Sequence, residues 1–224
     1  MSNNLKKIEL FKNFTDEELK ELGPYLTTTL YKKKEDIFAE GDPPEWFYIM
    51  SKGKVKVTKL SHDGKEIILE IISPFDIFGG VAVLRNFPYP ANAIAMEDSE
   101  VVKISRKNLM RLVDRFPNLM HCIALQLGDR MKSSYDSLKS IALERVEARI
   151  AALILKLSNK VGVETKEGLM IDMRLTKQDV ADMVGTTVET SIRTFSKFKK
   201  DGLVTDADGK IVIKDREGLM ALSS

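Results

Sequence analysis

The sequence predicts an α+β fold in which an antiparallel β-roll, of the double-stranded jelly-roll type, is followed by a long helix and a small C-terminal domain. Three observations predict this fold. Short β-branched runs, separated by turns rich in glycine and aspartate, recur between residues 27 and 105. A heptad pattern continues over residues 118–141. Two capped helical segments and a hairpin then occupy residues 175–213.

We therefore expect three parts: a β-roll over residues 1–116, a long helix over 117–143 and a C-terminal domain over 144–224. The chain has 224 residues, of which 43% are hydrophobic and 30% charged, the balance of a globular protein with a real core. Lys and Arg number 35 against 33 Asp and Glu, so the net charge of +2 is too small to indicate nucleic acid. Any nucleic-acid surface must be a local patch.

The composition excludes several classes of protein. The single cysteine, Cys122, rules out a disulfide within the chain and any metal or iron–sulfur site built from several thiolates. No segment has the roughly 18 uncharged apolar residues that a membrane helix needs. The first residues, MSNNLKKIELFKNF, lack the apolar core of a signal peptide. We expect a cytoplasmic protein with no membrane contact.

The predicted roll begins after a short helix. Asp16–Leu22 reads as that helix, with Thr15 and Glu18 as a capping box and Gly23-Pro24 as the stop signal. The strand-like runs that follow are Phe47–Met50, Val55–Thr58, Ile67–Ile72 and Val101–Ile104. Because turn sequences such as His62-Asp63-Gly64-Lys65 separate them, the runs indicate an antiparallel sandwich or barrel.

The long helix carries a heptad seam. Its members step by four and then three residues: Met120, Ala124, Leu127, Met131, Ser134, Leu138 and Ile141. A seam of this length beside a compact sheet favours pairing with a second copy over packing within its own domain, so we expect a homodimer. Ser134, the one polar member, either sets the register of the pair or faces a ligand; the sequence leaves both open.

The last third reads as helix, helix, helix and hairpin. Ala148–Leu157 is apolar and helical, and Leu175–Gly185 is a capped helix ended by its glycine. Thr186 or Thr187 opens the next helix, which runs to Lys200. A hairpin around Asp206-Ala207-Asp208-Gly209 follows. Two short helices joined at a glycine turn, then a hairpin, describe a winged helix-turn-helix.

The second helix of this motif is the candidate binding element. Glu189 and Arg193 lie one turn apart near its start, so they share a face. At this place in such motifs, Arg pairs with guanine and Glu accepts from cytosine in the major groove. We expect further DNA contacts from Thr187, Thr190, Lys197 and Lys199. The alternative is that Glu189 completes a capping box with Thr186 and pairs with Arg193 in solvent. That alternative does not explain the basic run from Arg193 to Lys200, which contains no acidic residue. We therefore favour double-stranded DNA as the partner.

At this point the chain resembles a known family. The stretch DVADMVGTTVETSIR, Asp179–Arg193, is similar to the DNA-binding signature of the Crp/Fnr transcription regulators, and the order of parts matches nearly the whole chain. The resemblance implies a homodimer on an inverted-repeat operator, with RNA polymerase as a further partner. It places Glu189 and Arg193 on the positions that read a TGA-type half-site. Val188 replaces the arginine of the cyclic-AMP branch, and Ser191-Ile192 reverses the common order, so Ile192 either contacts a thymine methyl group or packs inside.

The same resemblance locates a sensor loop in Asp76–Ala93. Cyclic-nucleotide members carry Phe-Gly-Glu there and, about ten residues on, Arg-Ser; the glutamate binds the ribose and the arginine neutralises the phosphate. Here Gly80 replaces the glutamate, and Pro90 and Ala91 replace Arg-Ser. Arg85 lies on the far side of the turn. Because a buried phosphate without a cationic partner is costly, cyclic AMP is disfavoured as the effector.

An apolar ligand, no ligand, or a contact with RNA polymerase all remain open for this loop. The candidate pocket residues are Gly79, Gly80, Val81, Tyr89, Pro90, Ala91, Ser134 and Tyr135. The hydroxyl of Tyr89, Ser134 or Tyr135 would orient a small-molecule effector, and packing or solvent exposure is the alternative for each of them.

Other sensing chemistries and enzymatic activity find little support. The oxygen-sensing branch of the family carries an N-terminal cysteine cluster, which this chain lacks; Cys122 reads as a small buried residue and His121 as a helix-surface residue rather than a haem ligand. We expect no cofactor and no metal. No nucleophile–base pair or nucleotide-binding glycine loop appears at an interpretable spacing, so no enzyme is expected. A second class of function stays open: a ligand-sensing roll that acts on protein partners, with the C-terminal domain as an interaction platform.

Overall fold

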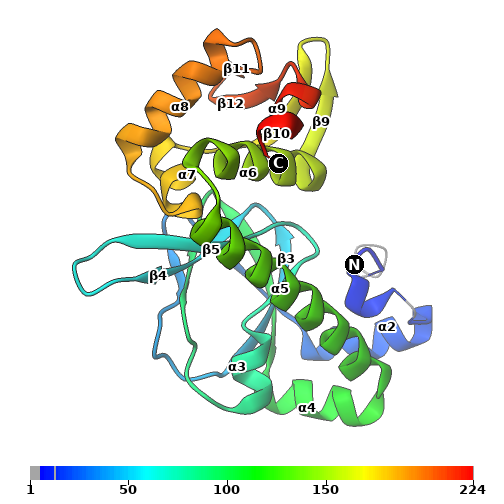
Figure 1. Cartoon of the computed structure of the whole chain (residues 1–224). Helices are drawn as coiled ribbons and strands as arrows, with labels where there is room; N and C mark the ends of the chain where they lie inside the picture. The colour runs from blue at the N-terminus through cyan, green and yellow to red at the C-terminus, as the bar shows by residue number, and fades with distance from the viewer. Residues whose placement is uncertain (1–5, 13, 224) are drawn as a thin grey trace. The chain divides into compact units, whose positions relative to one another are not determined.

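The computed structural model describes residues 6–12 and 14–223. The chain divides into two compact units, residues 1–131 and 132–224. The first unit is built on β-strands and the second on helices around a small sheet (Figure 1). The predicted α+β class is therefore confirmed. Within the described residues, no helix is both long and apolar enough to cross a membrane.

The first unit opens with short helical elements: η1 (Glu9–Phe11), α2 (Asp16–Leu22) and η2 (Gly23–Tyr25). The predicted capping box of α2 is present, because the Thr15 hydroxyl accepts from the Glu18 amide at 3.2 Å and the Glu18 carboxylate accepts from the Thr15 amide at 2.7 Å. Leu19 and Leu22 are buried, so α2 packs against the roll through one face.

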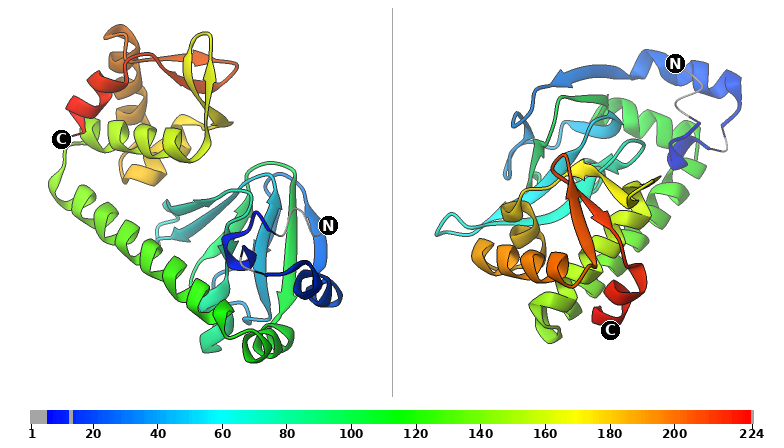
Figure 2. Two further views of the ribbon diagram at one scale, coloured as in Figure 1. Left: turned by 90° about the vertical axis from the view of Figure 1, so that its right-hand side faces the viewer. Right: turned by 90° about the horizontal axis from the view of Figure 1, so that it is seen from above.

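The roll consists of two four-stranded antiparallel sheets (Figures 1 and 2). The first sheet has the order β1 (Thr27–Tyr31), β8 (Ser99–Ser105), β3 (Trp46–Lys52) and β6 (Ile77–Phe78). The second has the order β2 (Asp36–Phe38), β7 (Asn92–Ala95), β4 (Val55–Leu60) and β5 (Glu66–Ile72). Fully buried Phe47, Val55 and Val101 come from both sheets and belong to one core, as expected for two sheets packed face to face.

Two helices complete the roll. The adjacent glycines Gly79 and Gly80 begin the short helix α3 (Gly80–Arg85), whose N-cap Gly79 has a left-handed φ of 72°. A side chain at position 79 would be strained in that conformation, which explains the glycine. Helix α4 (Arg106–Arg115) follows β8 directly and is capped by the Ser105 hydroxyl.

Helix α5 (Asn118–Leu143) contains the boundary between the two units. Its first turns bury Leu119 and Ile123 in the core of the roll, and Cys122 packs there partly buried. The heptad seam lies on other positions, and most of its apolar members are open to solvent in the single chain: Met120 39%, Met131 55%, Leu138 66% and Ile141 40% exposed. A helix with an exposed apolar stripe has a surface that a partner would cover.

The second unit is a winged helix-turn-helix with one more hairpin than the sequence indicated. Its elements are α6 (Val146–Val161), β9 (Gly162–Thr165), β10 (Gly168–Arg174), α7 (Lys177–Val184), α8 (Val188–Lys200), β11 (Val204–Ala207), β12 (Lys210–Ile213) and α9 (Arg216–Leu222). The reading of helix, helix, helix and hairpin was incomplete, because it omitted β9, β10 and α9. Strand β10 lies in the middle of the sheet, which has the order β11-β12-β10-β9. The predicted wing is present, and its turn residues Asp208 and Gly209 both have positive φ.

Candidate DNA-binding surface and sensor loop

Helix α7 and the following turn are fixed by local hydrogen bonds. The Thr176 hydroxyl accepts from the Asp179 amide at 3.0 Å, and the Asp179 carboxylate accepts from the Thr176 amide at 2.9 Å, which completes a capping box. Gly185 ends α7 in the left-handed conformation, with φ 65° and ψ 53°. This conformation suits glycine, so the turn between the two helices is set by residue type.

Helix α8 has one buried face and one exposed face. Ser191, Thr194, Phe195 and Phe198 are buried and hold it against the rest of the domain. Glu189, Ile192, Arg193, Ser196, Lys197, Lys199 and Lys200 are exposed. The side chains of Glu189 and Arg193, four residues apart, therefore lie on one open face of the first turns of α8.

Two roles were considered for Glu189: contact with DNA bases, or a local role in the helix cap and an ion pair with Arg193. The structure tests the local role. Thr187, not Thr186, is the N-cap: its hydroxyl accepts from the Thr190 amide at 3.3 Å. The third helical position, where a capping-box glutamate belongs, is held by Thr190, so Glu189 is not part of the cap. Among the described residues, no ion pair joins Glu189 to Arg193. Neither local role that competed with DNA contact is found for Glu189.

The lysines near α8 differ in their surroundings. The Lys197 ammonium is bound by both oxygens of Glu147 on α6, at 2.9 and 3.1 Å, while Lys199 is exposed. Lys177 at the start of α7 lies over the Phe195 ring, 3.7 Å from its centroid. Burial, and then repulsion from Lys199, lowers the pKa of Lys177. A surface ion pair such as Lys197–Glu147 contributes little to stability, so Lys197 can exchange it for a phosphate at little cost.

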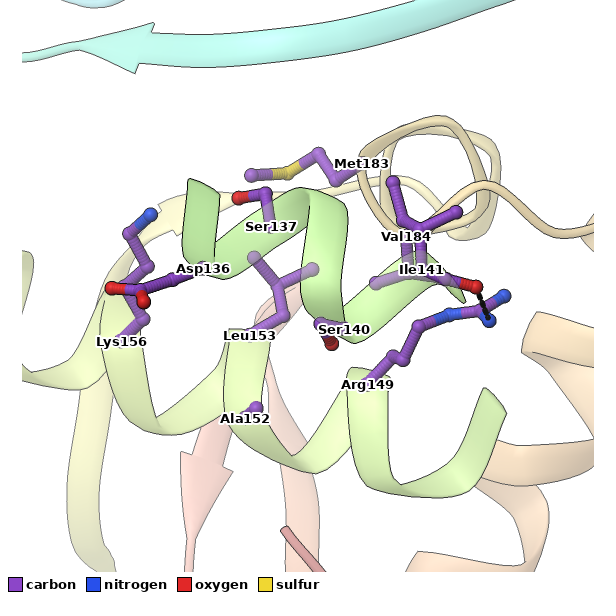
Figure 3. A pocket seen from close by; sticks show the side chains of 10 residues that line it. All are labelled: Asp136, Ser137, Ser140, Ile141, Arg149, Ala152, Leu153, Lys156, Met183 and Val184. Carbon is purple, nitrogen blue, oxygen red and sulfur yellow. Dashed lines mark hydrogen bonds between the residues drawn. The ribbon is translucent and has the colours of Figure 1, made fainter. Parts of the chain in front are cut away.

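One residue that the sequence did not single out connects α5 to the turn. The Arg149 guanidinium donates to the carbonyls of Ile141 and Glu144 at the end of α5, at 3.3 and 3.2 Å. It also donates to the carbonyl of Gly185 at 3.2 Å. These carbonyls lie in or just after the last turns of α5 and α7, where a positive charge is favourable. Figure 3 shows Arg149 on the wall of a cavity of about 160 Å³ between α5, α6 and α7.

The sensor-loop glycines are packed against aromatic rings. A Cβ at Gly80 would stand 2.9 Å from the ring of Phe47, which is fully buried. A Cβ at Gly79 would meet Tyr48 at 3.0 Å and Tyr89 at 3.2 Å. The backbone therefore lies where these rings leave room only for glycine, and a glutamate at position 80 would require Phe47 to move.

Tyr89 is part of the core of the roll. Its side chain stacks on Phe38 with ring centroids 4.0 Å apart, and only 2% of it is exposed. Its hydroxyl donates to the Trp46 carbonyl at 2.5 Å and accepts from the Trp46 amide at 3.1 Å. Tyr48 and Phe78 stack beside it. Burial raises the pKa of Tyr89, so the phenol stays protonated and able to donate.

The remaining pocket candidates are divided between the two units. Gly79, Gly80, Val81, Pro90 and Ala91 surround α3 and the start of β7 in the first unit; Val81 and Pro90 are exposed and Ala91 is buried. Ser134 and Tyr135 are exposed residues of the α5 segment that belongs to the second unit.

The cationic side chains near the loop include Arg85, Arg106 and Arg130, and Arg106 Nε donates to the Val83 carbonyl of α3 at 2.9 Å. Arg85 ends α3 and is exposed. Arg130 of α5, which sequence reasoning missed, donates to the Ile77 carbonyl and stands 3.5 Å from the Glu70 carboxylate. Because the Glu70 carboxylate balances its charge, Arg130 would attract a phosphate group less strongly than an unpaired cation would. Within the described residues, no group of three or more His, Cys, Asp or Glu side chains could hold a metal ion.

A β-roll with a sensor-type loop and a winged helix-turn-helix together define a DNA-binding regulator. Comparison with known proteins agrees. Residues 28–116 match the cyclic nucleotide-binding domain model, and residues 148–222 match the Crp-like helix-turn-helix domain model. The chain belongs to the Crp/Fnr family of transcription regulators, which are not enzymes.

The relatives of this chain are named for different regulatory roles. The CRP-like cAMP-activated global transcriptional regulator of Mycobacterium tuberculosis is 25% identical over 98% of both chains. The anaerobic regulatory protein of Bacillus subtilis is 27% identical over 84% of this chain and 80% of its own. The solved structure of FixK2 from Bradyrhizobium japonicum has a TM-score of 0.81 at 23% identity, covering 89% of this chain and 98% of that one. The likeness to FixK2 supports the fold.

Proposed function

We propose that this regulator binds an inverted-repeat operator as a homodimer, with one α8 in the major groove of each half-site. The observation that carries the proposal is the open face of α8, on which Glu189 and Arg193 stand side by side while the opposite face is buried. Arg193 would pair with guanine O6 and N7, and Glu189 would accept from cytosine N4. Thr187, Thr190, Lys197 and Lys199 would contact the sugar–phosphate backbone.

The homodimer is proposed from the seam on α5. Met131 and Leu138 are more than half exposed in the single chain, and they repeat at heptad spacing with Met120 and Ile141. Covering these side chains with the same seam of a second copy would remove them from water. Two-fold symmetry of the dimer would then match a palindromic operator with half-sites about 34 Å apart.

Arg193→Ala tests the reading of bases. It should weaken binding to the selected operator by about 1–3 kcal/mol and relax the preference at one base pair in each half-site, because a bidentate contact is lost. Competition binding of a randomised duplex library, followed by sequencing, measures both effects. Lys199→Ala is the matched control, since loss of a phosphate contact should weaken all duplexes alike and lower the salt dependence. Equal losses on operator and random DNA for Arg193→Ala would reject the base-reading role.

We further propose that the effector is not cyclic AMP. Gly80 and Pro90 stand at the positions of the charged recognition pair, Phe47 fills the space a larger side chain would need at position 80, and Arg130 is paired with Glu70. The names of the relatives indicate different signals and therefore do not identify the effector of this chain. An isothermal titration with cyclic AMP should show no binding at micromolar concentrations; a clear micromolar isotherm would overturn this part.

An apolar effector is the ligand chemistry that best suits the rest of the loop. Val81 and Pro90 present apolar surface beside α3, and Phe87 adds to it with 37% exposure. Native mass spectrometry of the freshly purified protein tests for a retained molecule. RNA polymerase is the proposed protein partner, since a transcription regulator must change the binding or activity of that enzyme at the promoter.

A further inference from the structure

Two adjacent residues of α8 are placed against the usual preference of their side chains. Ser191 is fully buried, and its hydroxyl has no hydrogen-bond partner among the residues that the structure describes. Ile192, the next residue, is 49% exposed. A buried hydroxyl without a partner costs free energy, and isoleucine is among the residue types most often found inside. The local sequence is therefore not explained by folding of the domain alone.

The exposed isoleucine stands on the proposed reading face. In an α-helix, position 192 lies three residues after Glu189, so these two side chains are neighbours on the surface of α8, and the exposed Arg193 follows directly in the sequence. Ser196, one turn further on, is exposed as well. Ile192 is consequently an apolar side chain among polar and charged ones, at the place where α8 would face base edges.

The major groove offers one apolar group on its base edges, the 5-methyl group of thymine. A branched aliphatic side chain cannot hydrogen-bond to the other edges, and it would leave their polar groups without water or partner. Its favourable contact in the groove is therefore with a thymine methyl group.

We propose that Ile192 is a specificity-determining residue that contacts the 5-methyl group of a thymine next to the base pairs read by Glu189 and Arg193. This inference rests on the proposed base reading by α8. The 49% exposure of Ile192 argues against the alternative in which it packs inside, since the buried position of the pair belongs to Ser191. The operator half-site should contain an A·T pair with a fixed orientation at that step.

Replacement of thymine by deoxyuridine is the test, because it removes the methyl group and leaves the hydrogen-bonding edge unchanged. The operator is first selected from a random library with the full-length protein. Each thymine of one half-site is then replaced in turn, and affinities are measured by fluorescence anisotropy. One replacement should weaken binding about fourfold, the effect of burying one methyl group.

Two variants assign that effect. Ile192→Ser should bind the thymine and deoxyuridine duplexes equally, while Ile192→Val should keep most of the difference. Both should keep the parent melting temperature within about 2 °C, since the site is half exposed.

The outcomes separate this inference from the proposed function. An operator that depends on Arg193 but shows the same thymine preference with Ile192→Ser would overturn the role of Ile192 alone. An operator with no methyl-sensitive thymine would overturn it as well. Failure to select any operator would overturn both the inference and the base reading on which it rests.

Discussion

Removal of the Tyr89 hydroxyl distinguishes a structural role from a ligand-binding one. In Tyr89→Phe the ring keeps its stacking on Phe38, while the Trp46 carbonyl and amide both lose their partner. A typical hydrogen bond contributes about 1 kcal/mol, and a partly buried group left unpaired costs about 1–3 kcal/mol. Two such bonds to one backbone unit therefore predict a loss of about 2 kcal/mol in the free energy of unfolding.

That loss corresponds to a fall in melting temperature of roughly 4–8 °C for a chain of this size. Differential scanning calorimetry of the full-length protein measures it. Tyr135→Phe is the control, because Tyr135 is 62% exposed and its hydroxyl is open to water; its transition should shift by less than about 2 °C. If Tyr89→Phe melted within 1 °C of the parent, the hydroxyl would not be holding Trp46. A Tyr89 hydroxyl that does not hold Trp46 would be free to bind a ligand.

Two further substitutions test the sensor loop and the connection to the turn. Gly80→Glu should destabilise the protein by about 1–3 kcal/mol through overpacking against Phe47. Combining it with Pro90→Arg should still give no cyclic-AMP isotherm; recovery of micromolar binding would contradict the packing argument. Arg149→Met should cost about 1–3 kcal/mol of stability and weaken operator binding, because the carbonyl of Gly185 loses its donor. Arg145→Met, at the N-cap of α6 and four residues before Arg149, should change neither, and equal effects of the two would show that Arg149 has no special role.

The sequence predicted the helix-turn-helix well because its determinants are local. Thr176, Gly185 and Thr187 act on backbone groups within three or four residues of themselves, so their spacing alone defines the two helices. The heptad seam was equally readable, since its period is a property of one continuous helix. The placement of Ser191 inside and Ile192 outside was not readable, because both assignments fit a helix that starts at Val188.

Long-range pairing accounts for what was missed. Strand β10 has alternating apolar residues, but its partner β12 lies about 40 residues further along the chain, and the intervening helices dominate the pattern. The contacts of Arg149 with Gly185, and of Arg130 with Ile77, join residues 36 and 53 positions apart. A single arginine in a helix gives no sign of such partners. The role of Phe47 in excluding a side chain at Gly80 likewise appears only when the two segments are packed together.

The packing around Gly80 also bears on how this chain could change over generations. A route from the present loop to a nucleotide-binding one would need an acidic side chain at 80, a basic one at 90 and a smaller residue at 47. The first step alone crowds a fully buried ring, and the third alone opens a void in the core. We therefore expect both the acidic side chain at 80 and the smaller residue at 47 to cost stability when introduced alone. Under the proposal that cyclic AMP is not the effector, the aromatic packing around Gly80 opposes the stepwise acquisition of a nucleotide-recognition pair.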